Sequence, residues 1–123
     1  RITKLAKKHG YEHVLDEYLT DVLLEVKSNS VDAKKLRRLV ILRGVDDKDF
    51  RVIQVDVAGK GSALLVNENA NLTILLKDFS GGQLYEGTSL FRIPVDGLAV
   101  VGVTTYRNTL GGTRQAFVVK PAW

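Results

Sequence analysis

One stretch of the chain, from Tyr11 to Val26, constrains the fold more than any other because its apolar residues repeat with the period of an α-helix. These residues fall at the i, i+3, i+4, i+7 spacing that places side chains on one helix face: Tyr11, Val14, Leu15, Tyr18, Leu19, Val22, Leu23 and Val26. The pattern predicts an amphipathic helix over residues 11–27 whose apolar face is covered by another layer of the fold. The side chains expected to be buried against that layer are Leu15, Tyr18, Leu19, Val22 and Leu23.

The residues before this helix allow two interpretations. A short helix over residues 2–9 would place its apolar side chains, Ile2, Leu5 and Ala6, on one side. Gly10 would end that helix with a sharp corner. The alternative is a disordered basic arm, because the first residues of a domain are ordered only where other contacts hold them.

From Leu36 onward the pattern becomes that of β-strands. Runs of β-branched and bulky residues recur about every ten residues and are separated by polar or glycine-containing turns. The expected strands are Leu36–Arg43, Phe50–Val57, Ala63–Val66, Leu72–Lys77, Leu90–Val95, Leu98–Tyr106 and Thr113–Lys120. We expect the first two to pair as a hairpin, and the last two likewise. In the fifth strand, Phe91, Ile93 and Val95 are expected to point inward.

Together these patterns predict an α+β fold. The amphipathic helix over residues 11–27, with the short helix of the first interpretation before it, would pack on a six- to seven-stranded antiparallel β-barrel or sandwich. A chain of 123 residues has the size of one domain. We therefore expect a single domain over 1–123, helical and basic over 1–35 and β-rich over 36–123. No apolar run approaches the ~20 residues that span a membrane.

The net charge of +4 lies in the first third of the chain. Residues 1–43 contain ten Lys and Arg against six acidic residues, whereas residues 44–123 contain eight of each. Two clusters of cations are candidate contacts for nucleic acid or for an acidic protein partner: Lys4, Lys7, Lys8, Lys34, Lys35, Arg37 and Arg38. The aromatic residues do not alternate with these cations as base-stacking residues do, which favours the protein partner or a solvated surface.

The sequence contains few side chains that catalyse reactions. It has no Cys, which excludes a thiolate nucleophile and a cysteine-bound metal. His9, His13 and Glu17 have the spacing of metal ligands on one helix, but Gly10 between the histidines favours solvated side chains at a helix end. The sequence at 59–62, Gly-Lys-Gly-Ser, lacks the spacing of a phosphate-binding loop and predicts a β-turn. We expect no catalytic residue, no metal and no cofactor.

These observations favour a non-enzymatic binding or assembly subunit of a larger protein complex, such as a virion or a multiprotein machine, that acts through its surface and termini. Its partners would be other protein subunits, in an oligomer or a hetero-complex. The alternative is a nucleic-acid-binding module that uses the basic N-terminal third, and a second alternative is an enzyme with an unrecognised site. A terminal Trp can anchor an interface and hairpin tips are exposed, so the candidate interface residues are Val119, Pro121, Trp123, Arg107, Asn108 and Leu110.

Overall fold

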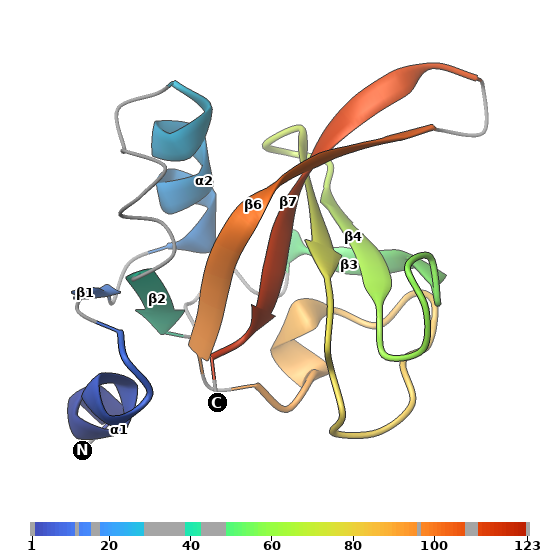
Figure 1. Cartoon of the computed structure of the whole chain (residues 1–123). Helices are drawn as coiled ribbons and strands as arrows, with labels where there is room; N and C mark the ends of the chain where they lie inside the picture. The colour runs from blue at the N-terminus through green and yellow to red at the C-terminus, as the bar shows by residue number, and fades with distance from the viewer. Residues whose placement is uncertain are drawn as a thin grey trace.

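The computed structural model describes residues 2–11, 13–15, 18–28, 39–42, 49–95, 97–107 and 111–122, which form an α+β fold with an open sheet (Figure 1). In chain order the elements are α1 (Ile2–Lys8), β1 (His13–Leu15), α2 (Leu19–Lys27), β2 (Leu39–Leu42), β3 (Arg51–Val55), β4 (Ala63–Asn67), β5 (Leu72–Leu76), the 3₁₀-helix η2 (Leu90–Arg92), β6 (Gly97–Arg107) and β7 (Thr113–Pro121).

The strands lie in the order β1-β2-β6-β7-β5-β4-β3. Five of them, β6-β7-β5-β4-β3, form the body of the sheet, and the short strands β2 and β1 continue it beyond β6. The sheet is mixed, because β5 pairs with β7 in parallel and β1 pairs with β2 in parallel. In the described part of the chain no ladder joins β1 to β3, so the sheet is open. The expected barrel or sandwich of six to seven antiparallel strands is therefore wrong in its closure, in the size of the sheet body and in its pairing.

The predicted hairpin between β2 and β3 is also wrong. β2 pairs with β6, where Ile41 lies opposite Leu98, and β3 pairs with β4, where Val52 lies opposite Leu65. The two strands lie toward opposite edges of the sheet although they are neighbours in sequence. Their pairing is decided by long-range contacts with β6 and β4, which the period of a single strand does not specify.

The predicted helix over residues 11–27 begins later than expected, at Leu19. His13–Leu15 instead forms β1, since pairing with β2 gives this backbone the hydrogen bonds that a helix would otherwise provide. Tyr18 precedes α2 in an extended conformation with ψ of 131°. Its side chain is 50% exposed, so the expectation that it is buried is wrong. Burial is confirmed for Leu19, Val22 and Leu23, while the side chain of Leu15 lies outside the described part.

The short helix before it is confirmed, and the disordered arm is wrong for the described residues 2–11. α1 ends at Lys8, and Gly10 then adopts a φ of +88°, which turns the chain back. The backbone N–H of Tyr11 donates to the carbonyl oxygen of Ala6 at 3.0 Å. Both residues pack against Ala99 and Ala122, so α1 is held on the sheet beside β6.

The main core lies between α2 and one face of the sheet, which we call the inner face. Its largest fully buried side chains are Phe50, Leu19, Leu23, Leu65, Ile74, Leu76, Leu90 and Ile93. Side chains alternate along a strand, so the strand residues that alternate with these inner-face residues point to the opposite face, which we call the outer face. There, α1 covers Ala99, and a separate cluster of Leu64, Leu75 and Ala116 lies at the centre of the sheet.

The predicted strand over residues 90–95 is replaced by η2 and an irregular segment. Phe91 is 63% exposed, so its inward orientation was wrongly predicted, whereas Ile93 and Val95 are buried as expected. The three-residue 3₁₀-helix explains the difference, because its turn does not preserve the two-residue alternation of a strand.

The outer edge of β3 is paired with the segment before η2. The backbone N–H of Val52 donates to the oxygen of Thr88 at 2.9 Å, and the N–H of Gly87 donates back to Val52 at 2.8 Å. The N–H of Leu90 donates to the oxygen of Phe50 at 2.8 Å. This segment therefore blocks the edge of β3 along these residues, as native proteins commonly arrange.

Candidate functional site

β6 and β7 form a long hairpin whose outer half leaves the sheet. Near Gly97 and Pro121 the two strands lie between β2 and β5, but beyond the pair Val103–Phe117, where β7 last pairs with β5, the hairpin projects from the rest of the molecule (Figure 1). We call residues 103–107 and 111–115 the distal arm. It is a two-stranded antiparallel ribbon that ends, in the described part, with Arg107 opposite Thr113.

The distal arm is cationic and rich in hydrogen-bonding side chains. Its exposed side chains are Val103, Thr105, Arg107, Thr113, Arg114 and Gln115. In the amino-acid sequence, residues 97–123 contain Arg107, Arg114 and Lys120 but no Asp or Glu. Arg107 was a candidate from the sequence, whereas Arg114 was missed. The acid-free stretch of 27 residues is the signal that would have found it.

A β-bulge turns the hairpin where the arm begins. Val100 pairs with Val119 and Gly102 pairs with Val118, so Val101 is an extra residue on β6. Such a bulge increases the local twist and redirects the strands beyond it. The bulge therefore marks the change from the half of the hairpin inside the sheet to the projecting half.

Tyr106 holds the distal arm against the outer face of the sheet. Its hydroxyl lies 3.2 Å from the hydroxyl of Thr73 on β5, so the side chain reaches across β7. Ala116 of β7 is fully buried in the same outer-face cluster, and its small side chain leaves room for the ring of Tyr106. The arm is thus braced on one face and open to solvent on the other.

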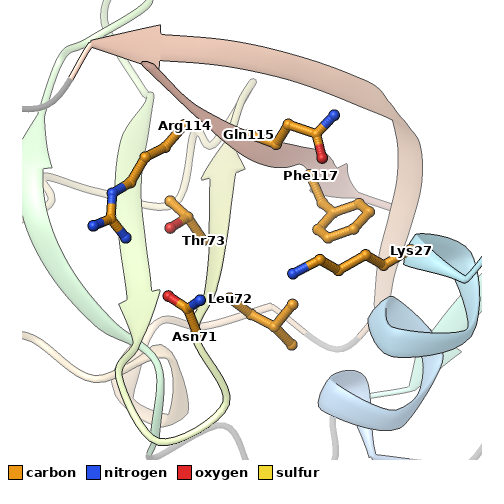
Figure 2. A pocket seen from close by; sticks show the side chains of 7 residues that line it. All are labelled: Lys27, Asn71, Leu72, Thr73, Arg114, Gln115 and Phe117. Carbon is orange, nitrogen blue, oxygen red and sulfur yellow. The ribbon is translucent and has the colours of Figure 1, made fainter. Parts of the chain in front are cut away.

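A hollow of about 170 Å³, which we call the basal hollow, lies where the arm joins the sheet and the end of α2 (Figure 2). Its lining consists of Lys27, Asn71, Leu72, Thr73, Arg114, Gln115 and Phe117. Leu72 and Phe117 are buried and supply its apolar part. The other five are cations or neutral hydrogen-bonding groups, and none of these described lining residues is acidic. This arrangement suits an anion.

A second and larger hollow, of about 1030 Å³, lies between the β3–β4 turn and the loop after β5. The two loops meet where the N–H of Phe79 donates to the oxygen of Gly61 at 3.0 Å. A Cβ on Gly61 would lie 2.5 Å from the carbonyl oxygen of Phe79, so this close approach of the two loops requires glycine. Asp56 and Lys60 line this hollow with opposite charges. The lining therefore favours no single class of ligand.

The turn predicted over residues 59–62 is confirmed. The N–H of Ser62 donates to the oxygen of Gly59 at 3.3 Å, which closes a four-residue turn. The hydroxyl of Ser62 is buried, accepts from the N–H of Ala58 at 2.9 Å and donates to Gly59. This hydroxyl stabilises the turn itself.

The first basic cluster from the sequence is exposed on α1, as Lys4, Lys7 and Lys8. Two further lysines lie on the outer face of the sheet, on the same side as α1. Lys120 lies opposite Ala99, which packs against α1, and Lys77 follows the pair Leu76–Val119 on the neighbouring strand. We call these five lysines the α1 patch. The second cluster, Lys34, Lys35, Arg37 and Arg38, lies outside the described residues.

The candidate interface residues at the C-terminal end lie in different surroundings. Val119 is fully buried in the main core, which removes it from the candidate interface. Pro121 is half-buried opposite Leu98, and the N–H of Ala122 donates to the oxygen of Gly97 at 2.9 Å. Trp123, Asn108 and Leu110 lie outside the described residues.

The histidines do not share a helix face. His9 follows α1 and His13 belongs to β1. Among the residues that the structure describes, no three His, Cys, Asp or Glu side chains lie close enough to hold a metal ion. Within the same residues, no helix has the length and apolar character needed to cross a membrane.

A comparison of the chain with known protein families, with curated proteins and with solved structures finds no match to any of them.

Proposed function

We propose that this chain is a non-enzymatic binding subunit whose partner is nucleic acid, contacted through the distal arm. The observation that supports this function is the arm itself, a projecting two-stranded ribbon with exposed Arg107 and Arg114. Arginine contacts phosphates and guanine edges, and Thr and Gln side chains add hydrogen bonds to bases and sugars. The absence of carboxylates from residues 97–123 leaves the arm without a group that repels phosphate.

The dimensions of the arm fit a DNA groove. The major groove, about 12 Å wide, admits a two-stranded β-ribbon, whose strands lie about 4.8 Å apart. Residues 103–107 extend about 16 Å at the usual strand rise of about 3.3 Å per residue. This length is enough to cross a groove and contact phosphates on both sides.

The α1 patch provides separate electrostatic attraction. Three of its five lysines are on α1, which is at the opposite end of the sheet from the arm (Figure 1). The two regions would therefore contact different segments of a long nucleic acid. Each phosphate contact contributes to the salt dependence of binding independently of sequence.

The test is the salt dependence of binding to a fluorescent 20-base-pair DNA duplex, followed by anisotropy. Each cation that contacts phosphate contributes about one unit to the slope of log K against log salt. The double variant Arg107→Gln, Arg114→Gln should therefore lower the slope by about two units. Arg51 and Arg92 are exposed on other elements, so Arg51→Gln, Arg92→Gln is the control with the same change of charge. Absence of binding at low salt, or equal slopes for the two double variants, would contradict the function.

The second candidate function, an assembly subunit of a larger protein complex, is favoured by exposed apolar side chains beside β3. Ile53 on β3 and Tyr85 and Phe91 near the paired segment 87–90 are all exposed. Aromatic side chains are enriched at protein interfaces. Replacing all three with Ser should abolish a concentration-dependent association in sedimentation velocity, and a monomer at every concentration would count against self-assembly.

A further inference from the structure

We infer that the basal hollow is a phosphate-binding site. The ligand chemistry is a phosphate monoester or diester, and the assignment of a backbone phosphate to it rests on the proposed function. The site itself follows from the side chains that line the hollow.

Two cations from distant parts of the chain line this hollow from opposite sides. Lys27 reaches it from the last turn of α2, and Arg114 reaches it from β7, with Thr73 and Asn71 between them (Figure 2). Since none of the described lining residues is acidic, the lining itself does not neutralise these cations. A hollow lined by two cations and by no acidic side chain attracts an anion.

The hollow also has neutral groups that hydrogen-bond phosphate oxygens. Asn71 and Gln115 supply amide N–H groups, and Thr73 supplies a hydroxyl whose position is held by Tyr106 at 3.2 Å. Asn71 lies at the start of β5 with a φ of +52°, and its backbone N–H donates to Glu68 at 3.3 Å. These donors therefore come from a fixed turn and strand.

The position of Lys27 relative to β5 is set by packing. α2 buries Leu19, Val22, Leu23 and Val26 in the main core. On the same helix, the hydroxyl of Thr20 accepts a hydrogen bond from the side-chain amide of Asn67 on β4 at 3.3 Å. The helix thus carries its last-turn lysine to a defined place beside the strand.

The charge of the lining favours a phosphate monoester over a carboxylate. A phosphate monoester carries about −1.5 to −2 charges at pH 7, which matches two cations better than the single charge of a carboxylate. Arginine binds either group through two parallel hydrogen bonds, so the charge of the ligand decides between them. The buried Leu72 and Phe117 reduce the access of water on one side, which strengthens these charged contacts.

The site is tested by titrating the protein with inorganic phosphate and with acetate while the backbone amide signals are followed by NMR. Phosphate should give saturable shifts at Thr73 and Gln115 and should bind more tightly than acetate. Lys27→Gln should weaken phosphate binding about tenfold, as expected for one charged hydrogen bond. Lys60→Gln is the control, because Lys60 is an exposed lysine outside this hollow. No saturable shift in the hollow, equal affinity for acetate, or an equal effect of the two variants would overturn the inference.

The duplex DNA assay separates this site from the proposed function, because Lys27 belongs only to the hollow and Arg107 only to the arm. If the site receives a backbone phosphate, Lys27→Gln should lower the salt slope by about one unit. If this variant weakens phosphate binding and leaves duplex binding unchanged, the site stands for free phosphate and the backbone assignment is overturned. Phosphate binding by a protein that does not bind the duplex would support the site and refute the proposed function. Duplex binding that depends on Arg107, without phosphate shifts in the hollow, would support the proposed function and refute the phosphate site.

Discussion

The two halves of the β6–β7 hairpin share one ladder but have different surroundings. Val100 in the inner half is fully buried, whereas Val103, three residues further along the same strand, is 49% exposed. The inner half is covered by the main core on one face and by α1 on the other. The distal arm is braced on the outer face by Tyr106 alone among its described hydrogen-bonding side chains.

This difference shows that β-forming residues do not by themselves decide whether a strand is buried in the core or exposed to a partner. Both halves contain valine, and both pair as antiparallel strands, with the register shifted by one residue at the bulge. The inner half has gained layers that bury it, so it stabilises the fold. The distal arm has not, so its side chains remain available to a partner.

The largest expected difference in stability is between Val→Ala substitutions made in the two halves of the hairpin. Val100→Ala removes fully buried methyl groups and should lower the free energy of unfolding by about 2–3 kcal/mol. Val103→Ala should change it by less than about 0.5 kcal/mol, as for other surface positions. Urea unfolding followed by circular dichroism measures both. Equal losses would mean that the distal arm is covered in solution.

A smaller effect is expected from filling the space under Tyr106. Ala116→Leu adds a larger side chain at a fully buried position and should cost about 1–3 kcal/mol through overpacking. Gln115→Leu, at the neighbouring exposed position, is the control and should be nearly neutral. A neutral Ala116→Leu in the same unfolding assay would show that the arm moves away from the sheet.

The hydrogen bond between Tyr106 and Thr73 should contribute about 0.5–1.5 kcal/mol. Tyr106→Phe and Thr73→Val each remove one of its hydroxyls, and the double variant should cost less than the sum of the two single losses. Amide hydrogen exchange at Thr105 and Arg107 should become faster in each variant, since the brace of the arm is lost. Additive losses would show that the two hydroxyls do not interact in solution.

The smallest effect on stability is expected from Tyr11, which packs with α1 against the inner half of the hairpin. Burial raises the pKa of the Tyr11 hydroxyl above its ordinary value of about 10. The folded protein therefore holds this proton more tightly than the unfolded chain does. The resulting stabilisation is fully present below about pH 10 and is lost as the pH rises through the folded-state pKa. Tyr11→Phe should show a shallower loss of stability above about pH 10 in urea unfolding, and identical pH profiles would refute this.

The elements with a long local pattern could be predicted from the sequence. The strands β3 to β7, the final hairpin and the buried face of α2 all follow from residue period and turn residues. The parallel pairing of β5 with β7 could not, because it depends on which distant strands pack together. The same limit explains β1, where pairing with β2 replaced the start of a helix that its own residues favour.

The candidate site was predictable only where its residues are neighbours in sequence. Lys4, Lys7 and Lys8 were found as a cluster, and Arg107 as part of an exposed hairpin tip. Lys27 and Arg114 were missed because they line one hollow only in the folded protein, in which α2, β7 and β5 are brought together. Whether these two cations line the same hollow depends on the order of the strands in the sheet, which the local sequence does not specify.

The position of β7 has a consequence for how the protein is made. The last strand lies in the middle of the sheet, between β6 and β5, and joins the group β1-β2-β6 to the group β5-β4-β3. During synthesis the two groups remain separate until residues 113–121 have left the ribosome. Sheets that depend on such distant pairings fold slowly and expose unpaired strand edges in the meantime. A nascent chain stalled before Thr113 should therefore be a substrate for chaperones, even though it already carries six of the seven strands that the structure describes.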